Sequence, residues 1–122
     1  MTDSQPSKTG QYISGKFFSN VKYEAARRGI EFDLTIDFLD GLIRGQNHKC
    51  YYTELPIDAK TRDSITASLD RLDSSKGYTK DNVHFVIKDV NMMKWTLKEK
   101  RFTQLCKLVA KVSDDKKNLE EI

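Results

Sequence analysis

The sequence has few of the residues that bind soft metals or cross-link a chain. Its 122 residues include two cysteines, Cys50 and Cys106, and two histidines, His48 and His84. The cysteines form no CxxC pair and the histidines have no ligand spacing, so a four-ligand zinc site would need all four residues from unrelated positions. We therefore expect reduced thiols and no structural zinc.

Long apolar runs are also missing. No segment approaches the roughly 20 residues that a helix needs to cross a bilayer, and residues 1–10 lack the hydrophobic stretch of a signal peptide. We therefore expect no membrane partner and a cytoplasmic location.

The composition that remains is typical of a folded domain. Hydrophobic residues make up 38% of the chain, charged residues 32% and aromatic residues 10%, which differs from the aromatic-poor composition of disordered chains. The length suits one compact domain with a modest core. We predict a disordered lead-in over residues 1–13, a single domain over 14–112 and a charged, frayed tail over 113–122.

Positive charge is concentrated in the second half of the chain. The net charge is only +3, but residues 62–112 carry 11 basic and 6 acidic side chains. This surplus suits a polyanionic partner such as nucleic acid. A solvated, lysine-rich surface explains it equally well, so charge alone does not decide the function.

Hydrophobic periodicity predicts an α+β fold. Helices are expected to begin near Ser14, Thr35, Lys88 and Thr96, and short extended segments are expected over 30–34, 48–55, 67–72 and 82–87. The last two segments form a hairpin with a long loop, and a short helix follows directly. We expect this hairpin-plus-helix unit to pack on helices from both ends of the chain.

A motif for chemistry lies in this unit. Residues 68–94 read SLDRLDSSKGYTKDNVHFVIKDVNMMK, which resembles the HNH endonucleases, and in particular a small phage and bacterial branch with SLDR-D, GY, NV and N-x-x-K in this order. The upstream segments AARRGIEFDLT and CYYTELP resemble that branch too, so the similarity covers about residues 14–110. It implies a ββα-metal motif over about 67–95 and a DNA endonuclease.

The chemistry of phosphodiester hydrolysis calls for a cation and a base. Hard oxygen ligands suit Mg²⁺ or Mn²⁺; Asp70 offers a carboxylate on the first strand and Asn91 an amide oxygen on the helix. The resemblance assigns these two residues the same role, as metal ligands. It also assigns Asn82 to bracing the loop through backbone hydrogen bonds, which is close to what an asparagine in an Asx-type turn does by itself.

The general base is the main departure from the family. Arg71 follows Asp70, where HNH enzymes usually carry the histidine that activates water, and a guanidinium cannot act as a base at neutral pH. Arg71 could instead bind the scissile phosphate. The base then remains open between His84, one of the phenols of Tyr51 and Tyr52, and a metal-bound hydroxide. Each of these side chains could equally be structural.

The expected partner is double-stranded DNA, with phosphate contacts from Arg71, Lys80, Lys88 and Lys94. A chain of this size has little room for a recognition domain, so specificity would come from a homodimer or a partner protein. A second hypothesis is a decayed HNH scaffold that binds DNA without cutting it. A third, a purely structural module, leaves the motif unexplained.

Overall fold

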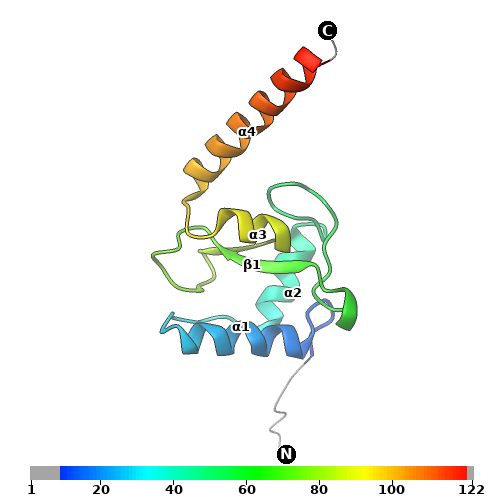
Figure 1. Cartoon of the computed structure of the whole chain (residues 1–122). Coiled ribbons are helices and arrows are strands. Elements are labelled where there is room, and N and C mark those ends of the chain that lie inside the picture. The colour runs from blue at the N-terminus through cyan, green and yellow to red at the C-terminus, as the bar shows by residue number, and fades with distance from the viewer. Residues whose placement is uncertain (1–8, 121–122) are drawn as a thin grey trace, which may run out of the picture.

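The computed structural model describes residues 9–120 and has an α+β fold, as predicted (Figure 1). Its elements in chain order are α1 (Gly15–Arg27), α2 (Ile36–Gly45), the 3₁₀ helix η1 (Arg62–Ser64), β1 (Ala67–Arg71), β2 (Val83–Ile87), α3 (Lys88–Lys94) and α4 (Glu99–Glu120). Within the described residues, no helix is both long enough and apolar enough to span a membrane.

The two strands form an antiparallel sheet whose register sets the two faces of the hairpin. Asp70 pairs with His84, and Leu69 pairs with Phe85. Because side chains alternate along a strand and paired residues share a face, Asp70 and His84 lie on one face and Leu69 and Phe85 on the other. The Phe85 ring lies 6.0 Å from the ring of Phe17 in α1, so the second face packs toward the N-terminal helices.

Helix α3 follows β2 without a connecting loop and packs back against both strands. Its inward residues are Val90 and Lys94, and it ends at Trp95, which has a positive φ of 49°. The hairpin and the helix thus occur in the predicted order, with α3 over the face that carries Asp70.

The two N-terminal helices begin where the sequence predicts. The side chains of Ser14 and Thr35 cap them by accepting hydrogen bonds from the backbone N–H groups of Phe17 and Phe38, at 2.9 and 3.1 Å. The apolar face of α2, which includes Leu39, joins α1 and the hairpin in one core. Its largest fully buried apolar side chains are Ile13, Leu39, Ile43, Phe85 and Val86.

Both predicted ends of the domain need correction. Ile13 is fully buried, and the carboxylate of Asp40 accepts hydrogen bonds from the N–H groups of Gln11 and Tyr12, each at 2.9 Å. The prediction of a disordered lead-in is therefore wrong for residues 9–13, while residues 1–8 lie outside the described part. At the other end, α4 continues to Glu120, so residues 113–120 are helical rather than frayed.

Two predicted extended segments are also shorter than expected. Segment 30–34 contains only an isolated bridge between Phe32 and Tyr78, and segment 48–55 contains turns and a bridge between Lys49 and Pro56. Its aromatic residues are used for packing instead: Tyr52 joins the edge of the core.

Candidate functional site

A cluster of ionisable side chains lies between the hairpin and α3. One carboxylate oxygen of Asp70 lies 2.8 Å from Nε2 of His84, and the other lies 3.3 Å from Nζ of Lys94. These three side chains, which we call the buried cluster, are no more than 5% exposed. Lys94 also donates to the backbone carbonyl of Arg71 at 3.1 Å.

Each member of the buried cluster is positioned by a different element. Asp70 and His84 meet because they are cross-strand partners in β1 and β2. Lys94 reaches them from the last turn of α3. A buried charge is costly unless it is paired and hydrogen-bonded, so the ammonium of Lys94 supplies the cation that the Asp70 carboxylate requires in this structure.

Two tyrosines enclose His84. The Tyr51 ring stacks on the imidazole with centroids 4.1 Å apart, and the Tyr52 ring meets it edge-on at 5.2 Å. Among residues 9–120, the buried hydroxyl of Tyr52 has no hydrogen-bond partner, and burial raises the pKa of Tyr52 well above its usual value of 10.0. A phenol that holds its proton this firmly is a poor base, which argues against Tyr52 in that role.

Asn91 lies on the open side of α3. Its Nδ2 donates to Oγ of Ser68 at 2.6 Å, and both residues line a groove of about 420 Å³ along β1. Asp70 is two residues from Ser68 on the same face of the strand. The structure therefore places Asn91 beside the strand of Asp70, although its recorded hydrogen bond is to Ser68.

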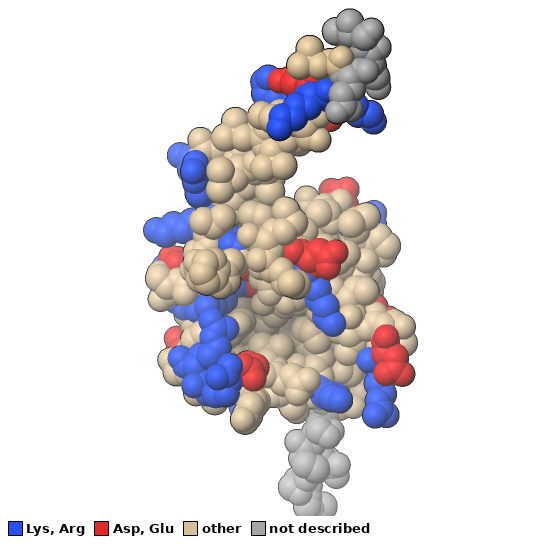
Figure 2. Space-filling view, in the orientation of Figure 1, with Lys and Arg blue, Asp and Glu red and all other residues tan. Residues whose placement is uncertain are grey.

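The groove along β1 runs between α1 and α3 and carries basic side chains. Figure 2 shows this face, which is hollowed between the two helices and has lysine and arginine around the hollow. Three basic residues line the groove, Lys16 from α1, Arg62 from η1 and Lys88 from α3, with Glu24 as the acidic one. The motif drew attention to Lys88, but Lys16 and Arg62 lie outside it and only the fold brings them together.

Asp70 and Asn91 offer the kind of oxygen ligands that a divalent cation such as Mg²⁺ prefers. An ionised carboxylate has about four lone-pair positions, of which Asp70 uses two, and no donor within the described residues reaches the amide oxygen of Asn91. The same part of the chain has no group of three or more His, Cys, Asp or Glu residues suited to a metal. A cation here would have two protein ligands and would compete with Lys94 for the carboxylate.

The hairpin loop is held by Asn82 and Arg71, which we call the loop brace. The side-chain amide of Asn82 is buried, donates to the carbonyls of Asp73 at 3.1 Å and Gly77 at 2.8 Å, and accepts from the N–H of Asp73 at 3.0 Å. Nη1 of Arg71 donates to the carbonyls of Ser74 at 2.9 Å and Lys76 at 2.7 Å.

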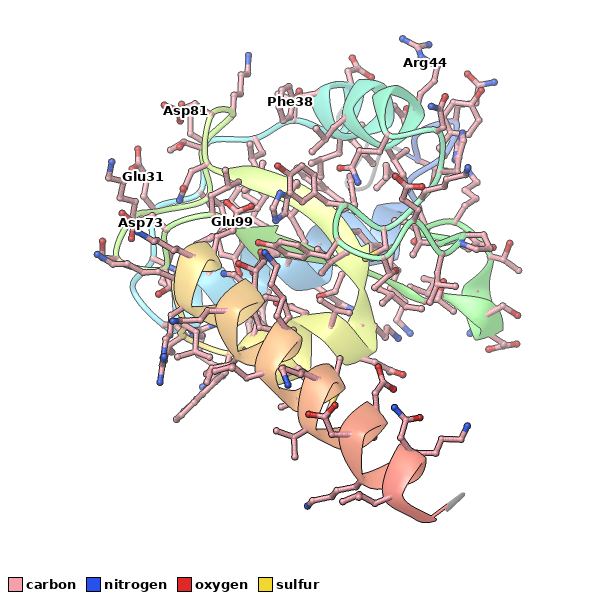
Figure 3. The ribbon with its side chains drawn as sticks, turned by 90° about the horizontal axis from the view of Figure 1, so that it is seen from above. Glu31, Phe38, Arg44, Asp73, Asp81 and Glu99 are labelled. Atoms are coloured by element: carbon pink, nitrogen blue, oxygen red, sulfur yellow. The ribbon has the colours of Figure 1, made fainter. Side chains whose placement is uncertain are left out.

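Arg71 is consequently part of the loop rather than a free phosphate ligand. Its guanidinium carbon lies 5.2 Å from the centre of the Tyr78 ring, and it lines a second groove of about 840 Å³ with Arg28, Lys76, Glu31 and Asp81. Figure 3 shows Glu31, Asp73 and Asp81 together at this end of the hairpin. This groove is lined by three basic and two acidic side chains, against three and one in the groove along β1, so the groove along β1 has the larger positive surplus.

The residues predicted to bind nucleic acid are spread over four places. Lys88 lines the groove along β1, Arg71 holds the loop, and the Lys80 ammonium lies 5.7 Å from the centre of the Phe38 ring on α2. Lys94 is fully buried, so the prediction that its ammonium contacts phosphate from the surface does not agree with this structure. Its spacing from Asn91 correctly placed it on α3 but gave no sign of burial.

Sequence reasoning also missed Gln46, which fixes the outer edge of β2. Its side-chain amide accepts from the N–H of Phe85 at 2.8 Å and donates to the carbonyl of the same residue at 2.9 Å. The N–H of Tyr51 donates to that carbonyl as well, at 3.0 Å. These bonds hold His84, next to Phe85, at its place opposite Asp70. A glutamine at the end of a helix gives no signal for this contact.

A viral protein is similar to most of this chain. No protein-family model matches the chain, and no solved structure matches it. An uncharacterized protein of Acanthamoeba polyphaga mimivirus is 31% identical over 98 residues, which cover 80% of this chain and 17% of the viral protein. The chain therefore spans less than a fifth of the length of the relative that it matches.

Proposed function

We propose that this protein is a metal-dependent DNA endonuclease of the HNH type, acting on double-stranded DNA with Mg²⁺ or Mn²⁺. The observation that carries the proposal is the buried cluster of Asp70, His84 and Lys94 between a hairpin and a helix. A fold has no need of three buried ionisable groups, and such groups concentrate at functional sites. The motif supplies the reaction class.

In this proposal Asp70 and Asn91 hold the cation. When bound, the cation neutralises charge on the phosphate in the transition state. Its ligands would be completed by water and by phosphate oxygens, since Mg²⁺ in proteins usually keeps several waters. Occupancy requires the ammonium of Lys94 to share or leave the Asp70 carboxylate, which links Lys94 to cation binding.

His84 is the base that the geometry favours over Tyr52. Its Nε2 lies 2.8 Å from a carboxylate oxygen of Asp70, and a carboxylate at this distance fixes the orientation of an imidazole. The residue is 4% exposed beneath Tyr51. Access of water to the ring therefore requires Tyr51, which is half exposed, to move aside.

The groove along β1 is the proposed DNA track. Lys16, Arg62 and Lys88 can contact backbone phosphates, with Asn91 at the same groove. Such contacts carry little sequence information, so specificity would come from a homodimer or a partner protein. The expected location is the cytoplasm, of a bacterium or of a phage-infected host.

The proposal is tested by plasmid relaxation with Mg²⁺, Mn²⁺ or EDTA. We expect nicking that depends on the metal and falls at least about 100-fold in Asp70→Asn, which keeps the size of the side chain but removes its charge. The matched control is Asp63→Asn, because Asp63 lies exposed in η1. Intact plasmid under all metal conditions would reject the endonuclease.

A specific observation favours the second candidate, a decayed scaffold that binds DNA. The Asp70 carboxylate already carries an internal cation, and Arg71 is used by the loop. This candidate predicts a gel shift that persists in EDTA and in Asp70→Asn, weakens with salt, and is lost when Lys16, Arg62 and Lys88 are replaced. Metal-dependent cleavage would exclude it.

A further inference from the structure

Helix α4 extends away from the body of the domain after its first turns, as Figures 1 and 3 both show. Phe102 anchors its start, at 5% exposure and with its ring 5.3 Å from the ring of Tyr52. Beyond this anchor four apolar side chains are 48 to 70% exposed: Leu108, Val109, Val112 and Leu119. An isolated helix in water is only marginally stable, so this apolar stripe favours a covering partner.

The stripe has the spacing of a coiled coil. The stripe contains two sets of residues, and within each set the members are seven positions apart. The second set is shifted from the first by three positions, as the d positions of a heptad are from the a positions. The first set is Phe102, Val109 and Lys116, and the second is Leu105, Val112 and Leu119. Beyond the anchor the repeat covers about two heptads, or roughly four helical turns, with one charged residue, Lys116, in it.

We propose that α4 pairs with α4 of a second copy of this chain, in antiparallel orientation. In such a pair the residues of the first set beyond the anchor face residues of the second set: Val109 faces Val112 of the second copy, and Lys116 faces Leu105 of the second copy. The stripe is therefore complementary to itself. Phe102 stays packed against Tyr52 of its own chain. A parallel pair would place Lys116 directly beside its own counterpart, where two like charges repel.

Lys111 and Asp115 lie beside the stripe and form an ion pair within α4 at 2.8 Å. In the antiparallel register Asp115 lies level with Cys106 of the second copy and Lys111 with Ala110 of the second copy. The ion pair therefore stays within each helix and neither favours nor opposes the pairing. The pairing is independent of the nuclease proposal, because none of these residues belongs to the buried cluster or lines the groove along β1.

The test is the molar mass in solution as a function of concentration, measured by sedimentation equilibrium on the full chain. We expect the mass to rise from 14.1 kDa toward twice that value. Val109→Glu should raise the dissociation constant at least about tenfold, or about 1.4 kcal/mol. The matched control, Ala110→Glu, places the same carboxylate one residue further, away from the stripe, and should leave the constant unchanged.

Lys116→Leu gives a prediction of opposite sign. It replaces the one charged residue in the seam, so the dissociation constant should fall. A monomer at every concentration in both the parent chain and Lys116→Leu would overturn the proposal, as would equal disruption by Val109→Glu and Ala110→Glu.

Cross-linking tests the orientation. In a Cys106→Ser background, chains with Val109→Cys and chains with Val112→Cys, distinguished by a tag, are mixed and oxidised. Antiparallel pairing predicts disulfides between the two kinds of chain. Disulfides that join only chains of one kind would show parallel pairing and overturn the antiparallel assignment.

Discussion

The buried cluster and the loop brace hold the same hairpin by opposite means. In the buried cluster, charged side chains face one another in a site with almost no solvent. In the loop brace, the amide of Asn82 and the guanidinium of Arg71 face backbone groups. The brace gives the loop its shape at little cost, whereas the cluster needs every partner present to offset the burial of charge. The cluster should therefore respond more strongly to the loss of one member.

Loss of the ammonium of Lys94 should have the largest effect. Lys94→Met keeps an unbranched side chain of similar length but leaves Asp70 buried without a cation, so the free energy of unfolding should fall by about 3 to 5 kcal/mol. Urea denaturation at neutral pH measures the change. Lys98→Met, at an exposed position just beyond α3, is the matched control and should change stability by less than about 0.5 kcal/mol.

A second substitution separates charge from packing. If the loss in Lys94→Met is caused by the unpaired carboxylate, then adding Asp70→Asn should recover part of it, with a coupling of at least about 1 kcal/mol. Additive effects would mean that packing around the lysine stem, and not the ion pair, supports the cluster.

The two networks also differ in how far the sequence predicts them. The loop brace is local: Asn82 and Arg71 contact residues within nine positions in the chain, and turn chemistry suffices to expect such bonds. The buried cluster depends on α3 folding back, so that Lys94 meets a residue 24 positions earlier. Periodicity placed Lys94 on a helix but could not tell a buried lysine from a solvated one.

The difference between local and long-range contacts also explains which other parts of the fold could be predicted. The helices and the hairpin were predicted because caps and alternating apolar residues are signals within one segment. The start of α4 is the exception, because this helix begins at Glu99 and Thr96 lies in the preceding turn. The order at residues 9–13 was missed because it depends on Asp40 of α2. The groove along β1 was missed for the same reason, since α1, η1 and α3 each contribute one of its basic residues.

Asn82→Ala tests the loop brace and should have an intermediate effect. It removes three hydrogen bonds to backbone groups, two at Asp73 and one at Gly77, and the free energy of unfolding should fall by about 2 kcal/mol. Faster amide hydrogen exchange should be confined to residues 72–82. Asn118→Ala, on the exposed end of α4, is the control. Exchange that accelerates equally across both strands would mean that Asn82 supports the whole hairpin.

Arg71→Ala should cost less, about 1 to 1.5 kcal/mol, because the carbonyls of Ser74 and Lys76 are near the surface and can bind water instead. DNA affinity in a gel shift distinguishes the brace from a phosphate ligand. We expect an affinity within about twofold of the parent chain and a salt dependence with an unchanged slope. A slope smaller by about one unit would identify Arg71 as a phosphate contact.

Tyr52→Phe should have the smallest effect at neutral pH, within about 1 kcal/mol, because the hydroxyl that it removes has no partner in the described residues. At high pH the free energy of unfolding of Tyr52→Phe should differ from that of the parent chain. Burial holds the pKa of Tyr52 in the folded state above its usual value of 10.0, so above about pH 10 the unfolded chain loses this proton first and the parent chain loses stability. Tyr52→Phe lacks that loss and should become the more stable of the two in urea denaturation above pH 10. Parallel stability curves for the two chains across this range would mean that Tyr52 ionises as freely in the folded protein as in the unfolded chain, and Tyr52 would again be a candidate base beside His84.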